Sequence, residues 1–557
     1  MRILLIAPPI EDFYFTPQRA YPLGILYLAS SLAVRGFTVK VLNALETNKK
    51  ITLKIPDDFT YLKRYYQPNR SPFCLFSNYY HFGLTYPEIE AVVRQFRPAL
   101  VGISSNFSPY FDTSRQVARI VKYVDARIPV VMGGRFPTSN PELVLGEKSV
   151  DFVIRGEGEE AFCALCSAVA EGRRISRIKG LCYKVNQRLH IASAPVLIKK
   201  LDALPFPDRR LIDYQRYVFG GTVMTSLISS RGCVLGCKFC AIQEKFRSRS
   251  ADNVFKEIVY CYSLGIRHFN FEDDNININP HFGKVLDHLI DNFAGKITVS
   301  FMNGLLAQGL HAGLRKKLLA AGLTHIDLSL VTSNRKVRLK TERPSWQKSI
   351  FDLSSFMARR GIAPTVHFII ALPGQRFIQA LADVKLLAKK TVKLGPSIFY
   401  PVIESGFFQE LKERFGFSAQ GYRLFRSSCA CFDRYMSRDE IFTIFYLSRV
   451  VNFVKDLIDN GVIQEDTLSS FLLTVPEKTN STNDNLVTVQ RIERERLGVI
   501  LLKKLIEEKS VYRVEEKQKN GQFYYAFFRD DFISAHHIRL ALEGLSVRGL
   551  SGRAIKI

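Results

Sequence analysis

The chain has 557 residues, of which 47% are hydrophobic and 23% charged, as expected for several folded domains with apolar cores. Ten cysteines in this length are too few for a disulfide framework, which excludes the small secreted class. The net charge is +26, but the basic residues are scattered, which argues against nucleic acid as a partner. We find no leader with a cleavage site and no apolar run of the roughly 18 residues that cross a bilayer, so we expect a cytoplasmic protein.

Residues 1–175 alternate between strand and helix patterns. The expected strands are apolar runs separated by helical spacing, at residues 2–7, 38–42, 100–105, 129–132 and 151–155. Such runs indicate a parallel sheet with helices on both faces, so we expect a Rossmann-like α/β domain. Ligands of these folds bind beyond the carboxyl ends of the strands.

Polar and glycine-rich loops follow the third, fourth and fifth of these strands. Glycine there lets a large planar or phosphate-bearing ligand approach the backbone, or it only makes a tight turn. The first strand is not followed by G-x-G-x-x-G, so a dinucleotide is not expected. The candidate ligand residues are Ser104, Ser105, Gly133, Gly134, Gly156 and Glu157.

Residues 176–220 are expected to hold a hairpin at 178–192 and a proline-stiffened linker at 204–208. Residues 221–402 then show six consecutive strand–helix units, which predict a partial (β/α)6 barrel with active residues at the strand carboxyl ends. The expected strands are 222–229, 268–272, 296–302, 325–330, 365–372 and 397–402.

Three cysteines follow the first barrel strand directly, in a C-x₃-C-x₂-C pattern formed by Cys233, Cys237 and Cys240. Three thiolates on one tight loop suit a 4Fe–4S cluster, whose fourth iron is then open to a ligand. Zinc usually takes four ligands in paired C-x₂-C units, and no second pair lies at a suitable distance. The remaining alternative is three ordinary buried cysteines.

With Phe239 before the last cysteine, this motif resembles that of the radical S-adenosylmethionine (SAM) superfamily. The resemblance implies that the three cysteines hold the cluster, that the open iron binds the amino and carboxylate groups of SAM, and that Phe239 packs beside adenine. It also implies reductive cleavage of SAM to methionine and a 5′-deoxyadenosyl radical.

Further SAM contacts are expected at the ends of the other barrel strands. Acidic groups could hold the SAM ammonium or ribose hydroxyls, although Asp274 or Asn279 could instead cap a helix. Arg249 could pair with the SAM carboxylate or be a solvated charge. The candidates are Glu272, Asp273, Asp274, Arg249, Asn303, Pro373 and Gly374.

The first domain resembles the cobalamin-binding domain of B12-dependent radical SAM proteins. The similarity lies in RILLIAPP, YPLGILYLASSLAVRGFTVKVLNA, VVMGG and VDFVIRGEGE, and runs over most of residues 1–175. Like many of those proteins, the chain lacks the D-x-H-x-x-G motif, and we do not assign His81, in the insertion at 46–85, to cobalt. One departure in this domain is Asn43, where aspartate is frequent. A second departure lies in the barrel, where Val331-Thr332 follow the fourth strand and many relatives have Glu-Ser-Gly.

Residues 403–557 carry no motif that we can interpret. Helices are expected at 404–415, 436–459 and 487–508, with a polar linker at 476–485 and a hairpin of strands 511–516 and 523–528 that turns at Asn520-Gly521. Cys429 and Cys431 could bind metal or quench a radical, but we favour buried thiols.

These features together predict a cobalamin-dependent radical SAM enzyme that functionalises an unactivated carbon, with methyl transfer as the expected reaction. The alternatives are a radical cyclase, rearrangement or oxidation without methyl transfer, a non-catalytic relative that binds SAM or cobalamin, and, from the net charge of +26, modification of RNA or a protein. The expected partners are a small-molecule or biosynthetic-intermediate substrate and an electron donor such as flavodoxin or ferredoxin.

Overall fold

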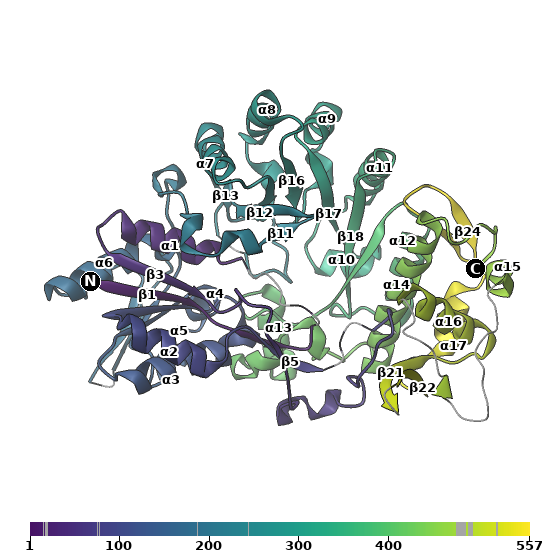
Figure 1. Ribbon diagram of the computed structural model, residues 1–557, viewed down its shortest axis with the longest axis horizontal. Coiled ribbons are helices and arrows are strands. Elements are labelled where there is room, and N and C mark those ends of the chain that lie inside the picture. The colour runs from purple at the N-terminus through teal and green to yellow at the C-terminus, as the bar shows by residue number, and fades with distance from the viewer. Residues whose placement is uncertain are drawn as a thin grey trace.

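The computed structural model describes residues 1–14, 16, 21–74, 76, 78–186, 188–242, 244–474, 486–487, 494–519 and 522–557. It contains two seven-stranded sheets, one formed by the first third of the chain and one by the middle third (Figure 1). Among the helices in these residues, none combines the length and the hydropathy that a membrane crossing requires.

The first sheet has the strand order β10-β9-β8-β7-β6-β1-β3. Alternate side chains of β1 enter two cores, since Ile3 and Leu5 pack toward α1 and α6 while Leu4 and Ile6 pack toward α2 and α3. This confirms the expected parallel sheet covered on both faces. The bounds are β1 (Arg2–Ala7), α1 (Leu23–Ala33), β3 (Thr38–Asn43), α2 (Tyr86–Phe96), β6 (Leu100–Ser104), α3 (Phe111–Val124), β7 (Val130–Gly133), α4 (Arg135–Ser139), α5 (Pro141–Gly146), β8 (Phe152–Ile154) and α6 (Gly158–Glu171).

The hairpin expected in the connector extends this sheet. Its strands β9 (Leu181–Val185) and β10 (Arg188–His190) form the antiparallel edge beside β8. The short strand β2 (Ile10–Asp12) after β1 and the insertion at 46–85 form a separate antiparallel sheet, in which β5 (Tyr79–Phe82) lies between β2 and β4 (Lys50–Leu53). His81 is buried there against Glu11, 3.1 Å away.

The second sheet is a half-barrel with the order β11-β12-β15-β16-β17-β18-β19. Its six strands β12, β15, β16, β17, β18 and β19 are parallel, which confirms the six expected units, and helices cover the outer face (Figure 1). The bounds are β11 (Val218–Phe219), β12 (Thr222–Leu227), α7 (Ala251–Ser263), β15 (His268–Phe271), α8 (Phe282–Phe293), β16 (Thr298–Phe301), α9 (Ala312–Ala320), β17 (Leu323–Val331), α10 (Arg335–Lys340), α11 (Gln347–Ala358), β18 (Ala363–Ile370), α12 (Phe377–Ala388) and β19 (Lys393–Ile398).

A buried ion cluster fastens the linker to the half-barrel. Arg209 of the linker is fully buried and lies 2.6 Å from Glu257 of α7. Arg249, just before α7, contacts the other carboxylate oxygen at 2.5 Å. Two guanidinium groups therefore share one carboxylate with no access to solvent.

The C-terminal region packs along the edge strand β19. Helix α14 lies against it, and the Asn452 side chain accepts from the Leu394 backbone N–H at 2.9 Å and donates to its carbonyl at 2.8 Å. The expected hairpin is present, whereas its turn Asn520-Gly521 and the 476–485 linker lie outside the described residues. The bounds are α13 (Gly406–Phe415), α14 (Arg438–Asp459), α15 (Leu468–Thr474), β20 (Leu486–Val487), α16 (Arg494–Glu507), β21 (Tyr512–Lys519), β22 (Gln522–Arg529), α17 (Ala535–Leu542), β23 (Ser546–Arg548) and β24 (Ala554–Lys556).

Candidate active site

A cavity of about 1140 Å³ lies between the two sheets. Its walls come from the carboxyl-end loops of the first sheet and from residues of the C-terminal region such as Ile403 and Phe408. The loop that carries Cys233, Cys237 and Cys240, which we call the cluster loop, also contributes. Drug-sized ligands occupy pockets of about 300–1,000 Å³, so this space suits a larger molecule or two molecules together. Its apolar part is lined by Leu5, Gly102, Val131, Ile154 and Phe162.

Most of the predicted first-domain residues line this cavity: Ser104, Gly133, Gly134, Gly156 and Glu157. Ser105 instead lines a neighbouring space of about 110 Å³, and its buried Oγ has no hydrogen-bond partner among the described residues.

Two of these glycines are required by close backbone contacts. Gly134 has φ 116°, and an added Cβ would lie 2.7 Å from the Ser105 carbonyl oxygen. Gly156 has φ 94°, and its Cβ would lie 2.2 Å from the Val196 carbonyl oxygen. The tight-turn explanation therefore accounts for both, whereas Gly133 has no neighbour within 4 Å of a Cβ and leaves room for a ligand.

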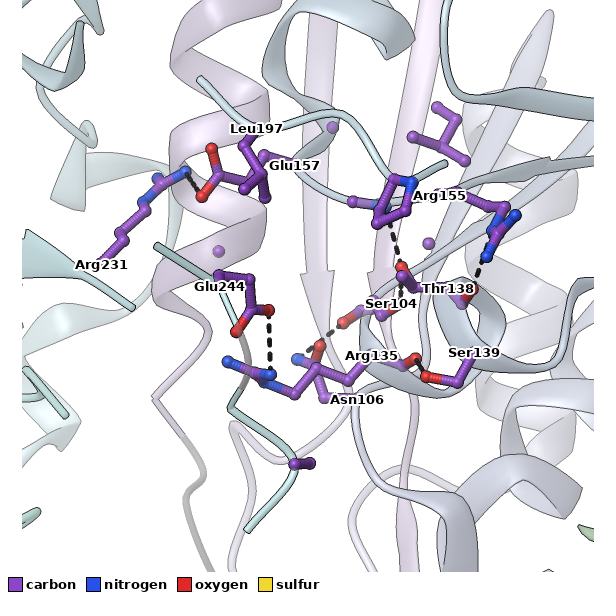
Figure 2. A pocket seen from close by; sticks show the side chains of 18 of the residues that line it. Ser104, Asn106, Arg135, Thr138, Ser139, Arg155, Glu157, Leu197, Arg231 and Glu244 are labelled. Carbon is purple, nitrogen blue, oxygen red and sulfur yellow. Dashed lines mark hydrogen bonds and ion pairs between the residues drawn. The ribbon is translucent and has the colours of Figure 1, made fainter. Parts of the chain in front are cut away.

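Glu157 and Glu159 tie the first domain to the half-barrel, and Figure 2 shows Glu157 beside Arg231. Arg247 lies 2.8 Å from Glu157, and Arg231 lies 3.4 Å from Glu157 and 2.6 Å from Glu159. Burial opposes ionisation of Glu157, but the two arginines outweigh it and hold its pKa below the usual range. Glu157, a predicted cobalamin contact, is thus an interdomain ion-pair partner at the cavity wall.

The cluster loop grows from a short two-stranded ladder, β13 (Ser230–Arg231) with β14 (Arg247–Ser248). Gly232 begins the loop with φ 84°. Only glycine suits this position, because a Cβ there would also lie 2.6 Å from the carbonyl oxygens of Glu244 and Lys245. The loop thus leaves and returns at neighbouring points, which presents the three cysteines at the end of β12.

Hydrogen-bond donors approach the three cysteine sulfurs. The Asn275 amide lies 2.9 Å from Cys233 Sγ, the Ile242 N–H 3.4 Å from Cys240 Sγ and Arg343 Nη1 3.6 Å from Cys237 Sγ. All three thiols are free of disulfides. Burial raises the pKa of Cys233 and Cys240 despite the donors.

The described residues contain no group of three histidine, cysteine, aspartate or glutamate side chains that could hold a single metal ion. A 4Fe–4S cluster has a different requirement, since each sulfur ligates its own iron and the sulfurs must surround a common space. The chemistry of this donor set fits a cluster, since it offers three free thiols on one loop, and the N–H donors to their sulfurs are of the kind that tune clusters in proteins.

The acidic residues after β15 divide into two roles. Glu272 and Asp274 line the cavity, and the Asn303 side chain donates to the Glu272 carbonyl at 2.7 Å. Asp273 is buried and accepts from the Ser229 N–H at 2.9 Å and from the hydroxyls of Ser229 and Ser230. Burial raises the pKa of Asp273 to about 6. Asp273 therefore anchors the end of β12, and only its two neighbours are placed to meet a ligand.

The other predicted SAM contacts lie outside the described lining of the large cavity. Arg249 is buried against Glu257, so its position does not support the prediction of a SAM contact. Phe239 packs against an apolar cluster that includes Val331 and Leu372. Pro373 and Gly374 follow β18, and Gly374 has φ 82°.

Backbone strain marks the ends of two adjacent strands. Val331 ends β17 with φ 66°, and Ala371 follows β18 with φ 65°. A β-branched residue at positive φ is a genuine outlier, and such strain gathers at functional sites. The sequence had shown Val331 only as a departure from a family pattern.

Sequence reasoning missed several residues of the wall. Arg231 lies two positions before Cys233, and this closeness to the motif was the available signal. Arg135 and Glu244 form an ion pair of 3.2 Å across the cavity (Figure 2), and Asn106 lies beside them. Arg135 and Asn106 belong to the loops expected after the fourth and third strands but were not named as ligand residues, and no pattern had indicated Glu244.

Cys429 is fully buried and Cys431 half-buried, as favoured for this pair. Burial raises the pKa of Cys429 to about 12 and that of Cys431 further. Thiols this resistant to ionisation are poor metal ligands and nucleophiles.

Comparison with known proteins agrees with this architecture. Residues 77–166 match the family model for the B12 binding domain, and residues 227–387 match the radical SAM superfamily. An uncharacterized methyltransferase of Pyrococcus horikoshii is 30% identical over 287 residues, 50% of this chain and 54% of the relative. Cytidylyl-2-hydroxyethylphosphonate methyltransferase of Streptomyces wedmorensis is 25% identical over 311 residues, 49% and 55% of the two chains. The chain thus spans about half the length of these curated relatives.

Solved structures share the fold. The radical SAM methyltransferase TsrM from Kitasatospora setae, with cobalamin and a [4Fe-4S] cluster bound, aligns with TM-score 0.56 and 17% identity over 74% of this chain and 75% of that one. The cobalamin-dependent SAM radical enzyme OxsB, with aqua-cobalamin and SAM bound, aligns with TM-score 0.57 and 14% identity over 86% and 69%.

Proposed function

We propose that this chain, which carries a B12-binding domain and a radical SAM domain, is a cobalamin-dependent radical SAM methyltransferase acting on a small molecule. The observation that carries the proposal is the single cavity to which the loops of the first sheet and the cluster loop both contribute. Two relatives named as methyltransferases favour methyl transfer over the other radical reactions.

Residues of the cavity wall fit the cofactors of this proposal together with the three cysteines, which lie on the cluster loop but outside the described cavity lining. Cys233, Cys237 and Cys240 would hold the cluster, and Glu272 and Asp274 would meet the polar groups of SAM. The apolar part of the cavity and the loops at Ser104, Gly133 and Gly156 would hold cobalamin. When bound, the cluster supplies the electron that cleaves SAM, and cobalamin supplies the methyl group.

The ion pairs at the cavity wall would keep water from the reacting groups. Arg231 bridges to Glu157 and Glu159, and Arg135 bridges to Glu244, so both domains close on the same space. Excluding water protects reactive intermediates and strengthens the electrostatic contacts within the site.

The surface beside the cluster loop suits an acidic electron donor. The backbone N–H of Lys238 donates to the Thr341 carbonyl at 3.0 Å, which sets α10 against the loop. Arg335, Lys336 and Lys340 of α10 are exposed. Basic groups near a redox centre steer an acidic protein toward it. A flavodoxin or ferredoxin fits this chemistry. The free cysteines of the chain fit the reducing cytoplasm in which such a donor would act.

The test is anaerobic reconstitution of the full chain with iron and sulfide, with and without added cobalamin. We expect cluster and cobalamin absorption bands, and 5′-deoxyadenosine after addition of dithionite and SAM. Cys233→Ala should abolish the cluster bands, while Cys429→Ala, at a buried thiol outside the motif, should retain them. A colourless protein after reconstitution would overturn the proposal.

Methyl transfer is separated from its alternatives by methyl-labelled SAM and a small-molecule extract of the native host. A labelled methyl group in a new product supports the proposal. 5′-Deoxyadenosine with only unlabelled products would favour a cyclase, rearrangement or oxidation. Bound SAM without any 5′-deoxyadenosine would favour the non-catalytic relative, to which the Val331-Thr332 departure points.

A further inference from the structure

Three titratable side chains meet on the inner face of the half-barrel, outside the described lining of the large cavity. His325 and Asp327 belong to β17, and His367 belongs to the neighbouring strand β18. The Nε2 atoms of both rings reach the same carboxylate oxygen, Asp327 Oδ1, at 3.2 Å and 2.9 Å. We refer to these three residues as the His–Asp–His cluster.

The cluster faces the lumen of the half-barrel. Ile326 and Leu328 are buried in the outer core, so the alternation of β17 turns His325 and Asp327 to the inner face. The Asp327 side chain is 10% exposed, whereas those of His325 and His367 are 28% and 45% exposed. The Asp327 carboxylate is thus buried and held in place, and the two imidazole rings are accessible from the lumen.

The next strand leaves room for the more exposed ring. A Cβ on Gly395 of β19 would lie 2.5 Å from Nδ1 of His367 and 2.8 Å from its Cε1. Any residue other than glycine would therefore displace the imidazole. Gly395 lies in the regular strand β19, so backbone conformation alone does not demand glycine there.

The strand register places the cluster at the depth of the candidate SAM contacts. Ser300 pairs with Asn270, and Phe301 pairs with Ile326, so Met302 falls beside both Glu272 and Asp327 in one row. Neighbouring strands lie about 4.8 Å apart, which separates Glu272 from Asp327 by roughly 10 Å. A small substrate in the lumen could reach both.

The geometry fixes how each ring is protonated. An ionised carboxylate only accepts hydrogen bonds, so each imidazole must present Nε2–H to Asp327, which leaves Nδ1 as an acceptor in the neutral ring. Neither Nδ1 atom has a hydrogen-bond partner among the described residues. Because both Nε2 atoms point to one oxygen, the three groups do not converge as metal ligands, in line with the absence of any such group in the described chain.

The charges within the cluster support this assignment. Burial opposes ionisation of Asp327, but hydrogen bonds from His325 and His367 keep its pKa below the usual range. The hydrogen bond to Asp327 raises the pKa of His325. Other titratable groups of this sheet are His268 of β15 and Glu272 just after it, one strand beyond β16, and Lys393 of the adjacent strand β19, which pairs with Asp456.

We propose that the His–Asp–His cluster is an acid–base site that binds a hydroxyl group of the substrate through Nδ1 of His367. The O–H bond breaks, the proton moves to Nδ1, the oxygen keeps the electron pair, and Asp327 stabilises the imidazolium. The proton returns once the carbon has reacted, so no net proton is consumed. An electron-rich oxygen weakens the adjacent C–H bond toward hydrogen abstraction, and this last step alone rests on the proposed function. The substrate class is therefore an alcohol.

The protonation pattern is tested by nuclear magnetic resonance on the full chain labelled with ¹⁵N-histidine. The two rings are assigned with His325→Gln and His367→Gln. We expect Nε2–H tautomers for both neutral rings, and at least a tenfold lower proton affinity of His325 in Asp327→Asn. His288, which pairs with Asp252 at the surface 2.9 Å away, is the internal control and should not respond to Asp327→Asn. Nδ1–H tautomers, or an unchanged His325, would overturn the proposal.

The ligand class is tested in the same spectra with ethylene glycol, and with 1,2-dimethoxyethane as the matched probe without a hydroxyl group. We expect ethylene glycol to shift the His367 Nδ1 resonance, 1,2-dimethoxyethane to leave it unchanged, and Gly395→Ala to abolish the response. No response, or equal responses to both probes, would refute hydroxyl recognition. Neither measurement requires SAM cleavage, so failure here and failure of the methyltransferase proposal are told apart.

Discussion

Replacing Glu257 by glutamine should destabilise the half-barrel more than any ordinary surface change. Among the described residues, Glu257 is the only carboxylate within ion-pair distance of Arg209 and Arg249, and all three side chains are at most 4% exposed. Glutamine keeps the size and one acceptor but removes the negative charge. Two buried guanidinium groups are then left without a counter-ion.

The magnitude follows from this burial. Removing one partner of a buried ion pair costs about 3–5 kcal/mol, because the remaining charge stays desolvated. Two charges are stranded here, so we expect the upper part of that range. Glu410→Gln is the matched control, since Glu410 pairs with Arg414 at an exposed helical i,i+4 position, where such pairs contribute about 0.3–0.5 kcal/mol.

The assay is urea unfolding followed by a probe in the half-barrel, compared between the two variants at constant pH. The wild type should also lose stability in acid. Burial opposes ionisation of Glu257, but Arg209 and Arg249 outweigh it and lower its pKa. The contribution of Glu257 to stability is therefore present above its unfolded pKa of about 4.3 and is lost as pH falls through its pKa in the folded protein. The Glu257→Gln variant should lack this loss. A cost below about 1 kcal/mol, equal to that of Glu410→Gln, would refute the reasoning.

Three further changes test the strand ends and the sheet edge. Ala371→Gly should raise the free energy of unfolding by about 1 kcal/mol, because Ala371 has φ 65°, and lower thermal stability would contradict strain there. Burial raises the pKa of Asp273 to about 6, so its contribution is complete below the unfolded value of about 3.9 and is lost as pH rises through 6. Asp273→Asn should remove that dependence in melting temperatures measured from pH 4 to 7, and an unchanged slope would exclude Asp273 as its source. Asn452→Ala should lower the free energy of unfolding by about 1–3 kcal/mol in thermal unfolding, because the backbone N–H and carbonyl of Leu394 lose their partner. Asn452→Asp keeps the acceptor and should lose less stability. Equal losses in the two variants would argue against the paired contact.

The sequence predicted both sheets well, because their strands are apolar runs that only a covered parallel sheet can bury. The cysteine motif lies after β12 as expected, since a loop at the carboxyl end of a parallel strand opens toward the ligand side. The hairpin at 178–192 was expected as a connector, but pairing of β9 with β8 satisfies an otherwise open sheet edge. Local patterns do not reveal such long-range pairing.

The remaining errors and omissions concern side chains that meet across the domains. Arg231 and Glu159 are 72 positions apart, and Arg247 and Glu157 are 90 apart, so no local spacing brings them together. Arg249 follows the cluster loop in sequence, yet the start of α7 turns it toward Glu257 instead of the cavity. The His–Asp–His cluster also escaped notice, because its members come from two strands and only the register joins them.

The contact between Asn452 and Leu394 has a consequence for strand pairing at the edge of the half-barrel. A half-barrel ends in edge strands, and an unprotected edge is a template on which another molecule can add a strand. At β19 a side-chain amide imitates the missing neighbour, and the long helix α14 lies along the same strand. The barrel can therefore stay incomplete, with its lumen accessible, without offering this border to intermolecular strand pairing.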